Sequence, residues 1–265
     1  MKVQDAVLKA QNKTGIGSKQ PELPGQSLLE IWQQAVADSS TYPAYTCIGQ
    51  TLTYGEVDQL ARRVASYFQK KLKLVAGDRI AVQLPNLIQY PIVVIAAWKL
   101  GLVIVNTNPM YTVRELIHQF NDSGAKAVVV LDQFYDTLCE ALPDTSIEHV
   151  IVTRPIDLLP QPKNMLLSGA MKLMGKRPSL AKGSHISFSD LLAGGSNYIA
   201  HKATLDDVCA LQYTGGTTGA SKGVMLTQNS LVSNVAQALS VISILEEPIT
   251  HSTCVAPLPI YHIYA

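Results

Sequence analysis

Residues 112–131 read TVRELIHQFNDSGAKAVVVL, and this stretch shows the alternation of helix and strand that decides the fold class. Thr112 and Glu115 have the spacing of a capping box, in which a hydroxyl and a carboxylate three residues later bond to free backbone amides. We therefore expect a helix from about residue 112, which ends near Gly124 because glycine suits a left-handed C-terminal cap. The valine-rich run Lys126–Leu131 that follows predicts a buried strand.

The same signals recur on both sides of this stretch. Ser27–Glu30 and Thr53–Glu56 predict helices from about residues 28 and 54. Short runs rich in valine and isoleucine predict further buried strands at Arg79–Leu84, Leu102–Val105 and His149–Thr153. Each parallel pair of strands needs a crossover, so this alternation predicts an α/β fold with mostly parallel sheets flanked by helices.

The order of these signals also predicts how the chain is divided. We expect a flexible leader at 1–26, a first α/β subdomain at 27–153, and the start of a second α/β subdomain at 207–265. Between them, residues 154–206 interrupt the rhythm with several prolines and glycines, which indicates an irregular basic segment and a boundary.

Composition excludes several classes of protein. The chain has 265 residues and a formal net charge of +1, which gives no reason to expect a nucleic-acid partner, and its 47% hydrophobic content excludes disorder of the bulk. The four cysteines form no Cys-x-x-Cys pair, so a reducing compartment is expected. The polar N-terminus lacks a secretory signal, and the most apolar stretch, Pro91–Val105, is too short for a membrane span. These features predict a cytoplasmic location.

Residues 213–223, YTGGTTGASKG, carry the most informative chemistry. Glycines let backbone amides approach an anion, threonines add hydroxyl donors and Lys222 adds a positive charge, a set that suits a polyphosphate. A Walker A loop is excluded, because Ser221 stands where the second glycine belongs and Gly223 follows the lysine. Strand-like runs flank the stretch, so we expect it to join two strands before Thr227 caps the next helix. The alternative is a flexible surface turn, but the order of the threonines, lysine and glycines favours phosphate binding.

This stretch resembles the phosphate-binding loop of the adenylate-forming acyl-CoA synthetase superfamily. Three further stretches resemble bacterial long-chain fatty acyl-CoA synthetases in particular: 82–91 (VQLPNLIQYP), 105–116 (VNTNPMYTVREL) and 257–264 (PLPIYHIY). The matches run in order from about residue 27 to 265. One departure is Ser221, where many members of the superfamily carry proline.

The resemblance implies a two-step reaction, in which a fatty acid and ATP form an acyl-adenylate with release of pyrophosphate, and coenzyme A then takes the acyl group. Magnesium accompanies the ATP. The residues that would hold the ATP phosphates are Tyr213, Thr214, Gly215, Gly216, Thr217, Thr218, Gly219, Ala220, Ser221, Lys222 and Gly223. Either Thr214 or Thr217 would lie near the magnesium, and Tyr261 and His262 would line the acyl and adenylate pocket.

Other residues have simpler explanations. Without the resemblance, His262 would be read as a histidine packed among Tyr261, Ile263 and Tyr264. The segment Asn106–Glu115 is explained as a turn that enters a helix. The remaining histidines have no ligand spacing and receive no role; they are His118, His149, His185, His201 and His251.

The family's later motifs and its C-terminal lid with a catalytic lysine are absent from these residues, and no catalytic residue is assigned. We therefore expect an N-terminal piece of a longer ligase, inactive by itself. Two alternatives stay open. One is a related ligase that adenylates another carboxylic acid, and the other is a nucleotide- or lipid-binding module without catalysis.

Residues 154–182 hold six basic residues against Asp157 alone, and their Met and Leu residues could form one face of a short helix beside Lys172 and Lys176. This pattern favours contact with an anionic membrane surface, and so a peripheral association with the inner face of the membrane. The alternative is a solvated basic loop whose Met and Leu residues pack on the protein's own core. A homodimer is a further assembly that the sequence leaves open.

Overall fold

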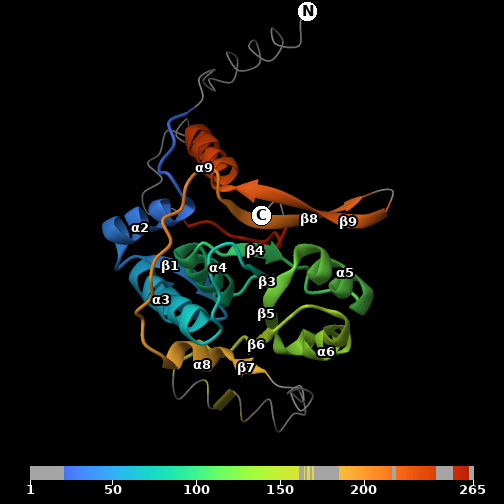
Figure 1. Ribbon diagram of the computed structural model, residues 1–265. Coiled ribbons are helices and arrows are strands. Elements are labelled where there is room, and N and C mark those ends of the chain that lie inside the picture. Colours follow the sequence, from blue (N-terminus) through green and yellow to red (C-terminus); the bar gives the residue numbers. More distant parts are fainter. Residues whose placement is uncertain are drawn as a thin grey trace, which may run out of the picture.

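The computed structural model describes residues 21–160, 164, 166, 167, 169, 185–216, 219–242 and 253–262. Within these residues a seven-stranded sheet has the strand order β7-β6-β5-β3-β4-β8-β9, and β1 and β2 form a separate hairpin (Figure 1). All neighbours in the large sheet are parallel except β8 and β9. The strands are β1 Pro43–Cys47, β2 Gln50–Thr53, β3 Arg79–Gln83, β4 Val103–Asn106, β5 Ala125–Leu131, β6 His149–Thr153, β7 Ile186–Ser187, β8 Val208–Gly216 and β9 Gly219–Thr227.

The helices lie in two groups, one on each face of the sheet (Figure 1). Alternate residues of β3 show the division, since Ile80 and Val82 pack with α2, α3, α4 and α8 while Ala81 packs with α5 and α6. The helices are α2 Leu28–Ser39, α3 Tyr54–Lys70, α4 Gln89–Leu100, α5 Val113–Ser123, η1 Asp132–Phe134, α6 Tyr135–Ala141, η2 Leu142–Asp144, α8 Phe188–Ala193 and α9 Gln228–Ile242.

The expected helix starts are confirmed. Thr53 and Thr112 each form a complete capping box, and Gly124 adopts the left-handed conformation at the end of α5. Ser27 also caps its helix, but the carboxylate of Glu30 accepts from the amide of Gln26 and not from that of Ser27. The local capping chemistry therefore defines where α2, α3 and α5 begin.

The four strands expected before residue 154 are β3, β4, β5 and β6, and the α/β class with a mostly parallel sheet is confirmed. Strand β8 pairs with β4 in parallel, with Ile104 opposite Ala210. The large sheet therefore includes strands from both sides of the segment 154–206.

Helix α4 has no N-terminal capping signal and no amphipathic period, although Gly101 ends it in the left-handed conformation. Nine of its twelve residues are buried, no side chain caps its N-terminus, and its own apolar residues are spread around the helix instead of along one face. An amphipathic period appears only when one face meets water, so a helix enclosed by α2, α3 and the sheet gives no such pattern. The apolar run that contains it indicates burial but not the type of element.

The connections of β3 and β4 create a topological switch point at one edge of the sheet, a place here called the crevice. The chain leaves β3 through α4 on one face and leaves β4 through α5 on the other, so the two exits diverge. In open α/β sheets such a switch point, at the carboxyl ends of the strands, is where ligands bind. Asn86 follows β3 and Asn106 ends β4, so both residues lie at this edge.

Candidate functional site

A chain of side-chain hydrogen bonds crosses the carboxyl ends of β4 and β8. The hydroxyl of Tyr90 donates to Oδ1 of Asn106 at 2.7 Å, and Nδ2 of Asn106 donates to Oε1 of Gln212 at 2.9 Å. Nε2 of Gln212 then donates to the carbonyl of Tyr261 at 3.0 Å. Stretches that lie far apart in the sequence therefore meet at the crevice.

A second contact joins the end of β3 to the same C-terminal segment. The side chain of Asn86 donates to the carbonyls of Ala256 and Leu258, both at 2.8 Å, and accepts from the amide of Ile260 at 3.0 Å. The amide of His262 donates to the carbonyl of Pro259 at 2.8 Å, so Tyr261 and His262 lie in the turn that follows.

Strands β8 and β9 form the expected pair around the glycine-rich stretch. Thr214 is the cross-strand partner of Lys222, and Gly216 is the partner of Gly219. The register shifts between these two pairs, so two residues of β9 stand opposite one of β8. Bulges of this kind leave backbone groups out of the ladder and often occur beside active sites. Thr217 and Thr218, also expected to bind phosphate, lie outside the described residues.

The alternation of side chains along β8 places Thr214 and Lys222 on a definite face. Gln212 bonds to Tyr261, and Thr214, two residues later, points to the same side of the strand. Lys222, its direct partner, shares that face at a separation of about 4.5 to 5.5 Å between Cβ atoms. Both side chains are exposed, and within the described part of the chain Lys222 forms no ion pair. The ammonium and hydroxyl groups therefore lie on the face that also carries the Tyr261–His262 segment.

The opposite face of the hairpin is anchored to α5. The hydroxyl of Tyr213 donates to Asp122 at 2.5 Å, and Nε2 of His118 lies 2.8 Å from the carbonyl of Ser221. A Cβ at Gly223 would lie 2.9 Å from Cζ of Tyr213, so the ring can cross β9 only above a glycine. Tyr213, expected among the phosphate ligands, therefore anchors the hairpin, and His118, for which the sequence analysis found no role, does the same.

Burial keeps the phenols of this region protonated. It raises the pKa of Tyr213, and the neighbouring carboxylate of Asp122 raises it further. Burial also raises the pKa of Tyr90, although its hydrogen bond to Asn106 acts in the opposite direction. The pKa of Tyr111 is raised by burial and by the nearby Glu115. At neutral pH these three phenols are therefore protonated and do not act as bases.

The segment Asn106–Glu115 performs the structural role that was expected of it, and Asn106 also belongs to the polar chain. Besides its side-chain bonds, its carbonyl accepts from Nε2 of Gln119 at 3.0 Å. The capping box of Thr112 and Glu115 lowers the pKa of Glu115 through hydrogen bonds from Thr112. Asn86, Asn106 and Gln212 were missed as site residues because a carboxamide has no distinctive spacing that identifies its partners.

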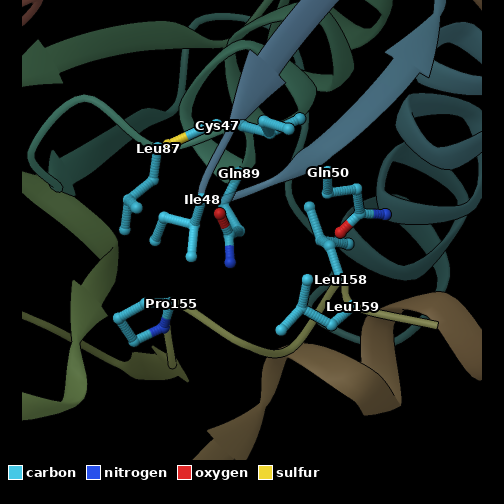
Figure 2. A pocket seen from close by; sticks show the side chains of 9 residues that line it. Cys47, Ile48, Gln50, Leu87, Gln89, Pro155, Leu158 and Leu159 are labelled. Carbon is cyan, nitrogen blue, oxygen red and sulfur yellow. The ribbon is translucent and has the colours of Figure 1, made fainter. Parts of the chain in front are cut away.

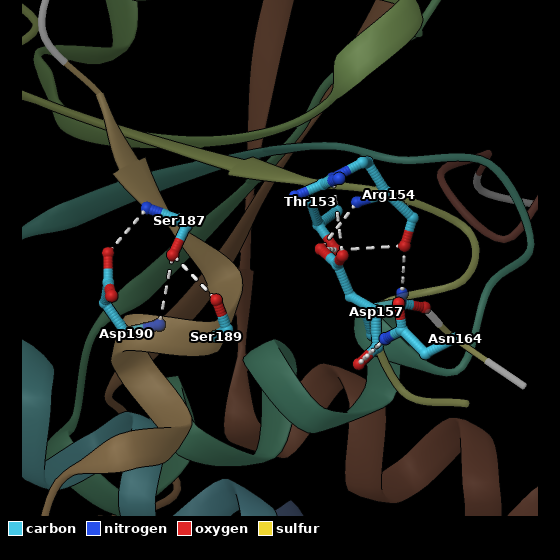
Figure 3. A network of polar contacts seen from close by, with 8 residues as sticks. Thr153, Arg154, Asp157, Asn164, Ser187, Ser189 and Asp190 are labelled. Carbon is cyan, nitrogen blue, oxygen red and sulfur yellow. Dashed lines mark hydrogen bonds and ion pairs between the residues drawn. The ribbon is translucent and has the colours of Figure 1, made fainter. Parts of the chain in front are cut away.

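The expected basic segment is described only in part. Lys163, Lys172, Lys176, Arg177 and Lys182 lie outside the described residues, and so do Met165, Met171, Leu173 and Met174. Arg154 forms an ion pair with Asp157 at 3.5 Å within a local polar network (Figure 3). Leu166 and Leu167 are 66% and 44% exposed. Among the described residues no helix is long and apolar enough to cross a membrane.

A cavity of about 280 Å³ lies at the opposite edge, beside the amino ends of β3, β4 and β8. His201 and Asp207 line it, with 2.8 Å between Nε2 and Oδ2, and this pair holds the imidazole over Gly101. Burial raises the pKa of the Cys209 thiol to about 12, so the thiol stays protonated and is a poor nucleophile. We attribute the contact between His201 and Asp207 to structural support of the amino ends of these strands.

Comparison with known proteins identifies the family of the chain. A family model described as "AMP-binding enzyme" matches residues 32–265. The long-chain-fatty-acid–CoA ligase of Escherichia coli O157:H7 is 38% identical over 243 residues, which cover 91% of this chain and 43% of that protein. The ligase of the same name from Haemophilus influenzae is 39% identical over 245 residues, which cover 91% of this chain and 43% of that protein.

Among solved structures, that of a long-chain-fatty-acid-CoA ligase from Archaeoglobus fulgidus superposes with a TM-score of 0.72 at 27% identity. The match covers 93% of this chain and 45% of that one. The chain therefore spans less than half the length of the relatives it matches.

Proposed function

Because the chain belongs to the AMP-binding enzyme family, we propose that it forms the phosphate-binding and carboxylate-binding part of an ATP-dependent long-chain fatty acid–CoA ligase. The complete reaction converts a fatty acid, ATP and coenzyme A into acyl-CoA, AMP and pyrophosphate through an acyl-adenylate. The similarity to ligases of this name supports the substrate class.

One observation carries the proposal. The hairpin face that bears Thr214 and Lys222 is the face on which Gln212 holds the carbonyl of Tyr261. A ligand bound there would meet an anion-binding hairpin on one side and an aromatic and an imidazole side chain on the other. An adenylation reaction needs this combination, because phosphate and carboxylate must be brought together.

The chemical difficulty of the first step is electrostatic, since an anionic carboxylate attacks an anionic α-phosphate. Lys222 would lower the repulsion by neutralising phosphate oxygens, and Thr214 and the backbone amides of the glycines would add hydrogen bonds. Tyr261 and His262 would orient the carboxylate for in-line attack. Positioning and charge neutralisation therefore explain the role of this part of the chain without a nucleophilic side chain.

Magnesium fits this site as an ion that enters with ATP. The described residues contain no group of three His, Cys, Asp or Glu side chains suited to a metal ion. Mg²⁺ commonly takes few protein oxygens together with substrate phosphates, and the exposed hydroxyl of Thr214 is such an oxygen. When bound, the ion would supply further neutralisation of phosphate charge.

The proposal is tested by pyrophosphate exchange in the complete gene product, with oleate or palmitate as the acid. We expect Lys222→Ala to remove about 1.5 to 3 kcal/mol of transition-state stabilisation, the strength of a hydrogen bond to a charged group. This loss would lower kcat/KM for ATP roughly 10- to 150-fold. Lys126→Ala is the matched control, because Lys126 pairs with Asp78 at 2.7 Å near the other edge of the sheet. Equal rates in the wild type and Lys222→Ala would remove Lys222 from the site.

We further propose that residues 154–182 contact an anionic membrane surface, from which a long-chain fatty acid is taken. The basic residues of the segment and the exposure of Leu166 and Leu167 support this. A cytoplasmic protein with this surface would associate with the inner face of the membrane. We also propose that the protein forms a homodimer.

A further inference from the structure

The segment that carries Tyr261 and His262 lies on the surface of the described structure, so packing alone does not hold it. Residues 253–259 are all exposed, and the side chain of Leu258 is 53% exposed. A segment with so little buried apolar surface needs other contacts to keep one conformation.

The sequence of the segment limits how it can pair with a strand. Pro257 and Pro259 have no backbone N–H, so one side of an extended segment here has no donor at these two positions. The carbonyls of Ala256 and Leu258 and the amide of Ile260 still need partners, and all three bond to the side chain of Asn86. One carboxamide thus bonds to three backbone groups of a segment that pairs with no strand among the described residues.

Further hydrogen bonds hold the loop that carries Asn86 in place. The thiol of Cys47 donates to the carbonyl of Asn86 at 3.5 Å, and Nε2 of Gln89 donates to the carbonyl of Arg154 at 2.8 Å. Figure 2 shows the β1–β2 turn and the 155–159 segment closing around residues 87–89, where a cavity of only about 10 Å³ is left. A side chain on a loop held by such contacts can position its partner more accurately than one on a free loop.

We propose that Asn86 is a positioning residue for Tyr261 and His262, and through them a determinant of fatty-acid binding. Its three hydrogen bonds hold the 256–260 segment so that the following turn meets Gln212 and the phosphate-binding hairpin. The assignment to fatty acid rests on the proposed function, whereas the positioning of the segment does not.

The ATP side of the site is held by other contacts. Tyr213 bonds to Asp122, and His118 bonds to the carbonyl of Ser221. None of these residues contacts Asn86 among the contacts described, so a change at Asn86 leaves Thr214 and Lys222 in place. The inference therefore predicts a specific kinetic pattern, in which binding of the acid is weakened and binding of ATP is not.

The first test measures hydrogen–deuterium exchange of the Ile260 amide, which needs no activity. Asn86→Ala should speed this exchange about fivefold, the effect of losing about one net hydrogen bond, while exchange in β3, β4 and β8 is unchanged. Asn121→Ala is the matched control, since Asn121 also donates to a backbone carbonyl, that of Asp144 at 2.7 Å, away from the crevice. Unchanged exchange at Ile260 in Asn86→Ala would refute the inference.

The second test measures KM for oleate and for ATP in the complete gene product. Asn86→Ala and Asn86→Asp should each raise KM for oleate about tenfold and leave KM for ATP unchanged. The aspartate has the shape of asparagine but cannot donate to the two carbonyls, so its effect separates bonding from size. An unchanged KM for oleate, or an equal rise in both constants, would overturn the specific role of Asn86. If the wild type has no ligase activity but exchange at Ile260 responds, the proposed function fails while the positioning by Asn86 stands.

Discussion

We expect Asp58→Ala to be among the most destabilising single substitutions in this chain. The side chain of Lys99, on α4, is 0% exposed, and its Nζ lies 2.6 Å from Oδ1 of Asp58 on α3. Asp58 also accepts from Nε1 of Trp32 at 3.1 Å and from Nε of Arg62 at 2.6 Å. The substitution would leave a buried ammonium group without its counter-charge between the two helices.

The expected magnitude follows from the difference in burial of the partners. Removing one partner of a buried ion pair costs about 3 to 5 kcal/mol, because the remaining charge is neither paired nor solvated. Arg62→Ala breaks a contact to the same carboxylate, but the arginine side chain is 49% exposed, so the expected loss is about 0.2 to 1 kcal/mol. Asp58→Asn combined with Lys99→Met removes both charges and keeps an acceptor for Trp32, and should recover most of the loss.

The dependence on pH distinguishes this cause from a loss of packing. Burial acts to raise the pKa of Asp58, but hydrogen bonds from Lys99, Arg62 and Trp32 outweigh it and the net pKa is lowered. The folded state therefore binds fewer protons than the unfolded state near the ordinary pKa of an aspartate. The stabilisation is fully present above that value and is lost as the pH falls through the lower, folded-state pKa.

In the Asp58→Ala variant the pH dependence moves to the alkaline range. Burial already lowers the pKa of Lys99 against the opposing effect of Asp58, so removing Asp58 lowers it further. Folded Lys99 then loses its proton below the pKa of the unfolded chain, and stability rises with pH over that interval. The difference between wild type and variant should therefore shrink between pH 7 and pH 10.

Urea unfolding at pH 7 and pH 10, followed by circular dichroism, measures these quantities. Asp38→Ala is the control, because Asp38 bonds to Gln34 at 3.0 Å on the exposed face of α2, and it should change stability by less than about 0.5 kcal/mol. A loss below about 1 kcal/mol in Asp58→Ala, or a loss of the same size at both pH values, would refute the reasoning.

Two further predictions concern the hairpin and the membrane. Gly223→Ala should force the Tyr213 ring away from Asp122, lower stability by roughly 1 to 3 kcal/mol as overpacking does, and weaken ATP binding; an unchanged melting temperature and an unchanged KM for ATP would contradict the anchoring role of Tyr213. Co-sedimentation with vesicles should strengthen with anionic lipid, weaken with salt and fall when Lys172, Lys176 and Arg177 are changed to Glu; sedimentation that does not respond to these changes would exclude residues 154–182 as the membrane contact.

Local chemistry accounts for what could be predicted from the sequence. The capping pairs Thr53–Glu56 and Thr112–Glu115 act within one turn of helix, so their spacing is visible in the chain and both were located correctly. The buried strands were likewise recognised from their own residues. The place of β8 beside β4 could not be predicted in this way, because it depends on which strand edge remains free after β3, β4 and β5 have paired.

The polar contacts of the site were unpredictable for a related reason. Asn86 and Ile260 are 174 positions apart, and Asn106 and Gln212 are 106 apart. No periodicity links residues at such separations, and an asparagine or glutamine fits many surroundings equally well. The motifs that contain Asn86, Asn106 and Tyr261 could be recognised as a set by resemblance, but only the folded chain shows that they share one edge of the sheet.

The register of β8 is what joins the two halves of the site. Gln212, which holds Tyr261, and Thr214, beside Lys222, are two residues apart, so they point to the same face. A slip of one residue would turn Thr214 toward α5 and Tyr213 toward the crevice, and the side chains proposed to bind phosphate would lie on the wrong side. The contact of Tyr213 with Gly223 and Asp122 opposes such a slip, because it fits only one alignment of β8, β9 and α5. The side chain that faces away from the site is therefore the one that keeps the site's two halves on a common face.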